Sequence, residues 1–165
     1  MSGGRPRGAV LTISDRVTRG VFEDRSGDTL VELLEAEGYE VAARETVPDE
    51  REQIAEAIRA LAAQADVVLT TGGTGFAPRD VTPEATASVL DREAPGLAEA
   101  IRADSIAKTP HALLSRGKAG IVGRAVVVNF AGSPGACRDG FGVIRPALPH
   151  AIKLLADEPT EHRNT

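Results

Sequence analysis

One segment, 69–84 (Leu-Thr-Thr-Gly-Gly-Thr-Gly-Phe-Ala-Pro-Arg-Asp-Val-Thr-Pro-Glu), holds the residues best suited to chemistry. Glycines that follow an apolar run let backbone N–H groups face a ligand, because no Cβ blocks close approach. The threonines add hydroxyl donors, and Asp80 adds a carboxylate, which beside a phosphate suits a bridging Mg²⁺. The segment therefore predicts a site for a phosphorylated ligand and a metal ion. The alternative is a plain turn between a strand and a helix, but such turns rarely combine threonine, arginine and aspartate.

Two carboxylates, Asp49 and Asp80, are the residues that we expect at the reacting centre. They follow different predicted strands, and together they could hold Mg²⁺ between the phosphate oxygens of a nucleotide triphosphate. Asp49 has an alternative role as the N-cap of the next helix, with Glu52 completing a capping-box pair. Capping is less natural for Asp80, because Thr82 already stands before Pro83 as the expected N-cap.

Other polar residues carry weaker signals. Asp15 could bind a ribose, orient a neighbouring loop or cap a helix, and Arg79 could form an exposed ion pair or a phosphate clamp. Ser105 and Ser115 have no chemical signature of their own, and His111 has no second histidine nearby for a metal site. The glycine loop is neither a Walker A motif nor a dinucleotide fingerprint, because the required spacings are absent. Gly73 and Gly75 are expected to take positive φ or to approach the ligand closely.

The elements that must position these residues follow from apolar periodicity. Strands are predicted at 8–13, 39–47, 66–71, 119–122 and 125–128, the last two joined by a tight turn at Gly123. Helices are predicted at 28–37, 50–63, 82–90 and 97–106, and over most of 137–155 with an interruption near two prolines. The segment 16–26 is expected to be a loop. This alternation predicts an α/β fold of three layers, α/β/α, with a mostly parallel sheet and one short hairpin-like pair.

Four loops should meet at one edge of that sheet. The carboxyl ends of parallel strands share an edge, and ligands of open α/β sheets bind there, near a switch in strand order. The loops are those at 14–16, Asp49, 72–75 and 129–133. Their convergence is stronger evidence for a site than any one of them.

Length and composition indicate the number of domains and exclude several classes of function. A chain of 165 residues predicts one domain, here 8–156, with flexible termini at 1–7 and 157–165. The net charge of −5, the lack of a basic patch and the few aromatic residues argue against nucleic-acid binding. No apolar run is long enough to span a membrane. The single cysteine, Cys137, cannot form an intramolecular disulfide, which suggests the cytoplasm, and we expect it to be buried rather than nucleophilic.

The sequence resembles the MoaB/MogA family of molybdenum cofactor biosynthesis. The resemblance is carried by Thr-Thr-Gly-Gly-Thr-Gly at 70–75 and Arg-Asp-Val-Thr-Pro-Glu-Ala at 79–85. Further matches follow in order at 12–16 with Gly20 downstream, 47–50, 91–96, 114–116 and 132–134, so that the similarity covers about 9–155. It implies a molybdopterin-binding α/β fold that is commonly trimeric. The implied reaction transfers AMP from Mg-ATP to the terminal phosphate of molybdopterin and releases pyrophosphate, with hand-over of the product to a molybdenum insertase.

The resemblance also implies roles for residues. Asp49 and Asp80 match the catalytic, metal-holding aspartates, and Ser105 and Ser115 match serines on the pterin phosphate side. The other expected substrate-binding residues are Ser14, Asp15, Thr71, Gly72, Gly73, Thr74, Gly75, Arg79, Thr82, Pro83, Gly132 and Ser133.

One feature departs from the family pattern, and a second leaves open which branch of the family the sequence resembles more. The last turn, Phe-Ala-Gly-Ser-Pro-Gly-Ala at 130–136, lacks the proline before Gly132 and a polar side chain after Pro134, so no side-chain contact is expected from position 135. The segment 14–16 and the loop with Gly20 look more like the MogA branch, whereas the length and the Leu-Ser-Arg segment fit either branch. The alternative function is a non-catalytic molybdopterin-binding or carrier protein of the MoaB type, which would keep the glycine loop without needing both aspartates.

Overall fold

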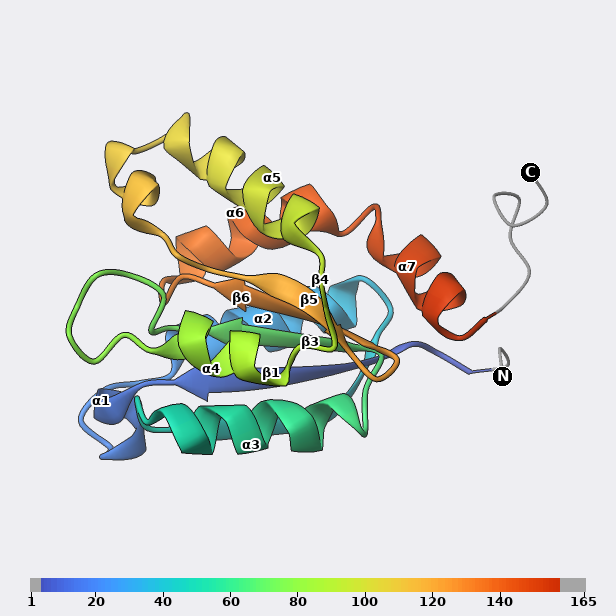
Figure 1. Cartoon of the computed structure of the whole chain (residues 1–165), viewed down its shortest axis with the longest axis horizontal. Coiled ribbons are helices and arrows are strands. Elements are labelled where there is room, and N and C mark those ends of the chain that lie inside the picture. Colours follow the sequence, from blue (N-terminus) through green and yellow to red (C-terminus); the bar gives the residue numbers. More distant parts are fainter. Residues whose placement is uncertain (1–3, 158–165) are drawn as a thin grey trace.

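Six strands form a single sheet in the computed structural model, which describes residues 4–157 (Figure 1). The strands are β1 (Arg7–Ile13), β2 (Glu40–Val47), β3 (Val67–Thr71), β4 (Arg92–Glu93), β5 (Ala119–Val122) and β6 (Ala125–Phe130). Their order is β2-β1-β3-β6-β5-β4, with parallel pairing from β2 to β6 and antiparallel pairing of β5 with both β6 and β4. The predicted mostly parallel sheet with a hairpin is confirmed.

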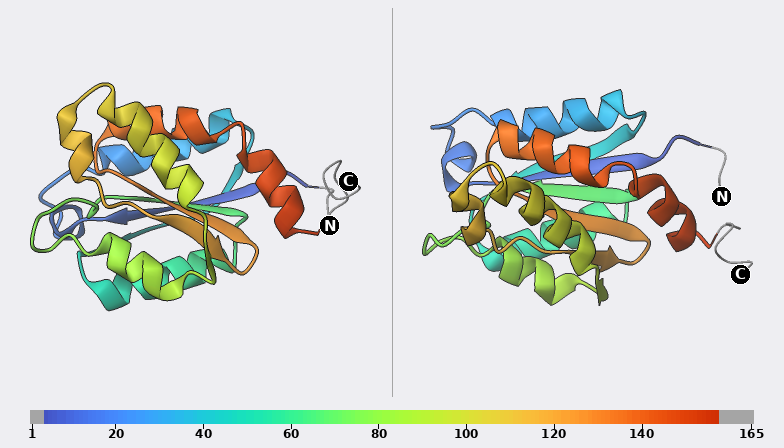
Figure 2. Two further views of the ribbon diagram at one scale, coloured as in Figure 1. Left: turned by 45° about the horizontal axis from the view of Figure 1, so that its top comes forward. Right: turned by 90° about the horizontal axis from the view of Figure 1, so that it is seen from above.

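Helices cover both faces of the sheet. They are α1 (Asp15–Thr18), α2 (Arg25–Ala36), α3 (Arg51–Ala62), α4 (Thr82–Val89), α5 (Pro95–Ile106), the 3₁₀ helix η1 (Pro110–Leu114), α6 (Pro134–Ile144) and α7 (Leu148–Leu155). Helices α3 and α4 pack on one face, and α2, α5 and α6 pack on the other (Figures 1 and 2). This confirms the three-layer α/β/α architecture.

The strand β1 shows how the sequence creates two cores. Ala9, Leu11 and Ile13 point into the core shared with α3 and α4, while Val10 points into the core shared with α2 and α6. Successive side chains of a strand face opposite sides, so a strand buried on both faces must be apolar almost throughout. All of these side chains are buried.

The order of the strands reverses next to β1. The chain leaves β1 for β2 on one side and then crosses back to β3 on the other. A crevice is expected outside the carboxyl ends of two strands at such a switch point, because their connections run in opposite directions. The loops that follow Ile13 and Thr71 both line such an opening.

Several elements differ from the sequence prediction. The loop predicted at 16–26 contains α1, which Ser14 caps by accepting a hydrogen bond from Val17 N, and it ends with the first turn of α2. The two-residue strand β4 is too short to give any pattern. The helical region predicted at 137–155 is interrupted as expected, but α6 begins earlier, at Pro134, because Ser133 caps it.

The ends of the described chain are tied to the sheet. Arg7, which the sequence analysis placed in a flexible terminus, begins β1, and Arg5 donates hydrogen bonds to the carbonyls of Gly38 and Tyr39. The predicted flexible residues 1–3 and 158–165 lie outside the described part. Within 4–157, no helix is both long and apolar enough to cross a membrane.

Candidate functional site

An open cleft of about 920 Å³ lies at the carboxyl ends of β1 and β3. It is formed by the loops after β1, β2, β3 and β6, so the predicted convergence of four loops is confirmed. Of the residues expected at the site, those that line this cleft are Ser14, Asp15, Asp49, Thr71, Gly72, Gly73, Arg79, Asp80, Gly132 and Ser133.

The remaining expected residues do not line the cleft. Thr82 and Pro83 are buried in the first turn of α4, where the Thr82 hydroxyl donates a 2.9 Å hydrogen bond to the carbonyl of Gly72. The N-cap of α4 is Val81, so the prediction that Thr82 is the N-cap is wrong. Thr82 instead supports the glycine loop through its hydrogen bond to Gly72. Thr74 is buried and Gly75 lies beyond the lining, while Ser105 lies in the last turn of α5 and Ser115 follows η1.

The glycine loop is shaped by two residues with positive φ. Gly72 has φ of 103° and Gly73 has φ of 68°. A Cβ on Gly72 would collide with the carbonyl oxygen of Ile13, and a Cβ on Gly73 would collide with the Thr82 hydroxyl. Of the two alternatives expected for these glycines, positive φ is found at Gly73 but not at Gly75, for which close approach to a ligand stays a prediction. Glycine is needed where the loop passes close to β1.

Asp15 and Asp49 join the ends of β1 and β2. Asp15 N donates to Asp49 Oδ2 at 2.9 Å, and Asp49 N donates to Asp15 Oδ1 at 3.0 Å. The N-cap of α3 is Glu50, which makes no side-chain capping bond. The predicted capping role of Asp49, with its capping box, is therefore wrong, because its carboxylate turns to the neighbouring loop instead of to its own helix.

Arg79 binds two acidic residues at the cleft, Asp15 and Glu50. Its Nε and Nη2 donate to the two oxygens of Asp15 at 2.7 and 3.1 Å, and Nη2 also donates to Glu50 at 2.9 Å. This hydrogen-bonded guanidinium lowers the pKa of Asp15 to about 2. The Arg79 side chain is half exposed, so the pair adds little stability. Of the two roles left open by the sequence, the ion pair is the one present here.

Asp49 and Asp80 each keep one carboxylate oxygen without a hydrogen bond to any described residue. Asp80 Oδ2 accepts from Gly75 N and Ala77 N at 3.1 Å each, which leaves Oδ1, and Asp49 uses only Oδ2. Burial, followed by the negative charges of Asp15 and Asp80, raises the pKa of Asp49. A cation between the two free oxygens would offset this repulsion.

These two oxygens are chemically suited to serve as two of the ligands of a Mg²⁺ ion shared with a phosphorylated ligand. Residues 4–157 contain no group of three or more histidine, cysteine, aspartate or glutamate side chains that could hold a metal. Mg²⁺ in nucleotide sites is bound by one or two carboxylates, with phosphate oxygens and waters completing an octahedron. Asp49 and Asp80 match that incomplete donor set.

Arg116 was missed as a positioning residue, although it stands in the Leu-Ser-Arg segment. Its guanidinium donates to the carbonyls of Gly75 and Asp80, both at 2.8 Å, and pairs with Glu84. Its own N–H donates to the carbonyl of Thr74 at 2.8 Å. Arg116 therefore fixes both ends of the loop 75–80 and holds the backbone of Asp80.

Replacing Arg116 with alanine should lower the free energy of unfolding by about 1–3 kcal/mol, because two carbonyls lose a charged donor. Equilibrium urea denaturation measures the change. Arg124→Ala, in the exposed hairpin turn, is the matched control and should change stability by less than about 0.5 kcal/mol. Equal effects of the two substitutions would contradict a specific role for Arg116.

The segment 16–26 supplies part of the cleft that sequence reasoning did not assign. Its lining residues include Arg16, Arg19, Phe22, Asp24, Arg25 and Ser26. Asp24 caps α2 by accepting from Gly27 N at 3.0 Å. An aspartate followed by Arg-Ser-Gly and an apolar helical stripe is an N-cap signal that could have located this turn.

Sequence and structure comparisons find known proteins that are similar over most of this chain. A family described as "Probable molybdopterin binding domain" matches residues 9–150. Molybdopterin adenylyltransferase of Helicobacter pylori is 38% identical over 154 residues, which cover 88% of this chain and 85% of that protein. The molybdenum cofactor synthesis protein cinnamon of Drosophila melanogaster is 42% identical, and there the chain spans only 26% of the relative's length. Among solved structures, the molybdopterin biosynthesis enzyme MoaB of Thermus thermophilus superposes with a TM-score of 0.86, at 46% identity, covering 93% of this chain and 98% of that one.

Proposed function

The chain belongs to the family of molybdopterin-binding domains of molybdenum cofactor biosynthesis, and we propose that it is a molybdopterin adenylyltransferase. It would transfer AMP from Mg-ATP to the terminal phosphate of molybdopterin and release pyrophosphate. The observation that carries this proposal is the pair Asp49 and Asp80, each with a free carboxylate oxygen in a cleft floored by Gly72 and Gly73. A protein that only binds the pterin has no need of two carboxylates beside an anion-binding loop.

The reaction requires the phosphate of molybdopterin and the triphosphate of ATP, both anionic, to approach each other beside the carboxylates of Asp49 and Asp80. A terminal phosphate oxygen of molybdopterin attacks the α-phosphorus of ATP, a new P–O bond forms, and the bond to the β-phosphate oxygen breaks. Asp49 and Asp80 would hold Mg²⁺, which would supply positive charge to the phosphoryl oxygens when bound. Gly73 presents a backbone N–H that has no acceptor among the described residues and is available to a phosphate. Asp15 orients Asp49 through their reciprocal hydrogen bonds, and Arg79 orients Asp15.

A direct assay tests the proposal. The protein is incubated with molybdopterin, ATP and Mg²⁺, and adenylylated pterin and pyrophosphate are quantified. Formation of both products in equal amounts supports the enzyme. Tight binding of molybdopterin without any product would instead support the non-catalytic carrier of the MoaB type.

Asp49→Asn should strongly impair the use of Mg-ATP and leave the melting temperature unchanged or slightly higher. The asparagine oxygen can still accept from Asp15 N, and the substitution removes a charge whose burial raises the pKa of the aspartate. The rate should fall about a hundredfold, as for loss of a metal ligand. Asp66→Asn is the control, because Asp66 also accepts from a backbone N–H, that of Arg7, but lies outside the cleft. Normal turnover by Asp49→Asn would leave this residue a structural role only.

We also propose that the protein assembles as a homotrimer in the cytoplasm and passes its product to a molybdenum insertase. Three large apolar side chains, those of Ile106, Leu113 and Leu114, are exposed around the end of α5 and η1 and offer surface for self-association. The unpaired, buried Cys137 is consistent with a reducing compartment. Light scattering at several concentrations would give the mass of three chains if the assembly is correct.

A further inference from the structure

The first turn of α2 presents donors to the cleft that neither the carboxylate pair nor the glycine loop uses. Ser26 lines the cleft, and the residue is only 9% exposed. Neither its hydroxyl nor its backbone N–H has a hydrogen-bond partner within residues 4–157. A buried polar group without a partner costs free energy unless a ligand or water satisfies it. Ser26 therefore has two donors available where a ligand can reach them.

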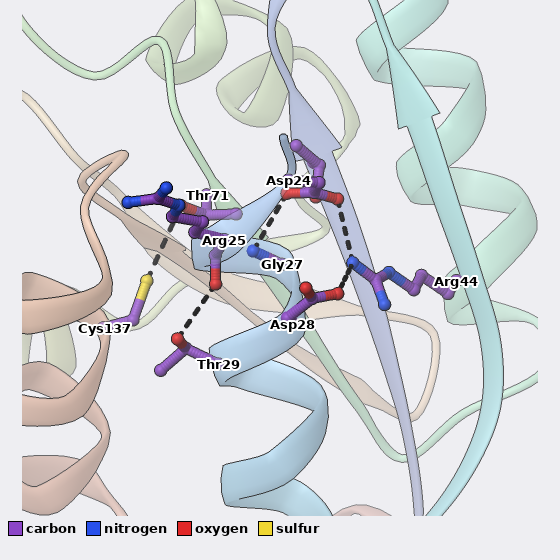
Figure 3. A network of polar contacts seen from close by, with 9 residues as sticks. Asp24, Arg25, Gly27, Asp28, Thr29, Arg44, Thr71 and Cys137 are labelled. Carbon is purple, nitrogen blue, oxygen red and sulfur yellow. Dashed lines mark hydrogen bonds and ion pairs between the residues drawn. The ribbon is translucent and has the colours of Figure 1, made fainter. Parts of the chain in front are cut away.

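The neighbouring carboxylate of Asp24 is held by protein donors and does not take up the Ser26 donors. Asp24 Oδ1 accepts from Gly27 N, and Oδ2 accepts from the Thr12 hydroxyl at 2.7 Å and from Arg44 at 3.0 Å. Figure 3 shows Asp24 between the start of α2 and Arg44, with Asp28 accepting from the same Arg44 nitrogen, Nη2. Both oxygens of Asp24 are therefore occupied by protein donors, and Arg44, which Asp24 shares with Asp28, offsets part of its negative charge.

Two helices begin at this part of the cleft. Helices α2 and α6 pack side by side on one face of the sheet, and the residues before each, Asp24 and Ser133, line the cleft (Figure 2). They have 12 and 11 residues, long enough for the aligned peptide dipoles to favour an anion at the N-terminus. Both helix N-termini therefore contribute a field that favours an anion in the part of the cleft that Ser26 lines.

Cations reinforce this field. Arg16 and Arg19 on α1 line the same cleft, and neither forms an ion pair with a described residue. Arg16 stacks over the ring of Phe22, with 5.4 Å between its guanidinium carbon and the ring centroid. This differs from Arg79, whose donors are taken by Asp15 and Glu50. Arg16 and Arg19 therefore keep guanidinium donors that no described carboxylate accepts from, and these donors are available to an anion in the cleft.

We propose that Ser26 and the first turn of α2 form a phosphate subsite, separate from the carboxylate pair of Asp49 and Asp80. The Ser26 hydroxyl and N–H would each donate to a phosphate oxygen. The identity of the ligand rests on the proposed function, in which both the nucleotide and the pterin carry phosphate. The shared chemistry is a phosphate or pyrophosphate group.

Two variants at Ser26 test the subsite. Ser26→Ala removes one donor and should weaken phosphate binding about tenfold, whereas Ser26→Asp places a negative charge in the subsite and should weaken it about fiftyfold or more. Aspartate in the first turn of a helix favours the dipole, so a structural role alone predicts an unchanged or higher melting temperature and unchanged affinity. Gly96→Asp is the control, because Gly96 occupies the same second position in α5, is exposed and has open space for a side chain.

Calorimetric titrations with inorganic pyrophosphate, a non-hydrolysable ATP analogue and molybdopterin identify the source of the phosphate. Weakened binding of pyrophosphate and the ATP analogue alone assigns the subsite to the nucleotide, and weakened binding of molybdopterin alone assigns it to the pterin. Unchanged affinity of folded Ser26→Ala for all three probes, or an equal loss in Gly96→Asp, overturns the proposal.

The same titrations separate this proposal from the proposed function. Turnover by the wild-type protein with unaltered probe binding in both Ser26 variants would remove only the subsite. Absence of turnover in the wild type, with pyrophosphate binding weakened by the Ser26 variants, would remove the adenylyltransferase and keep the phosphate subsite.

Discussion

Asp80→Asn is expected to lower the rate of adenylyl transfer about a hundredfold or more while the protein stays folded. The asparagine side-chain oxygen can still accept from Gly75 N and Ala77 N, so the loop 75–80 keeps its shape. The second oxygen, which has no partner among the described residues, is replaced by an NH₂ group that cannot bind a cation. Steady-state turnover at saturating Mg²⁺ and ATP measures the effect, and the melting temperature checks the fold.

Asp91→Asn provides the matched control for this substitution. Asp91 also accepts a hydrogen bond from a backbone N–H, that of Gly123, but it lies outside the cleft. Its turnover should equal that of the wild type. If Asp80→Asn retained a rate within a few-fold of the wild type, the metal-binding role of Asp80 would be excluded.

Gly72→Ala should lower the free energy of unfolding by about 3 kcal/mol or more, although it adds a single methyl group. At φ of 103° an L-residue is strained, and the new Cβ would also collide with the backbone carbonyl of Ile13 in β1. A backbone atom of a central strand cannot move aside as the end of a flexible side chain can. Equilibrium urea denaturation measures the difference in free energy of unfolding.

Gly123→Ala separates the two contributions to this loss. Gly123 has φ of 60° in the hairpin turn, and a Cβ there would meet nothing within 4 Å. It should therefore show only the backbone strain, about 1 kcal/mol. Similar losses at both positions would mean that the close approach of the glycine loop to β1 contributes nothing.

The pattern of the chain determined the fold and the location of the site. Apolar runs of period two and stripes of period 3.6 report burial locally, so the alternation of strands and helices was readable. Parallel strands necessarily bring their carboxyl ends together, and this placed Asp49, Asp80 and the glycine loop at one edge before any contact was known. The buried, unpaired Cys137 also followed from sequence alone.

Tertiary structure decided which partner each polar group takes. Local sequence makes Asp49 look like a helix cap, yet its carboxylate bonds to Asp15, 34 positions earlier, because β1 and β2 are adjacent in the sheet. The need for glycine at position 72 depends on the carbonyl of Ile13, which only the pairing of β1 with β3 brings near.

Arg116 and Ser26 are two further residues whose roles a local sequence pattern does not reveal. Arg116 reaches the loop 75–80 across at least 36 positions of sequence, and the donors of Ser26 matter because the strand order opens a cleft in front of α2. A local pattern records whether a residue is buried and in which element, since burial follows the period of the backbone. It does not record which groups from distant segments meet, because hydrogen bonds act over about 3 Å and that distance is set by the order and register of the strands.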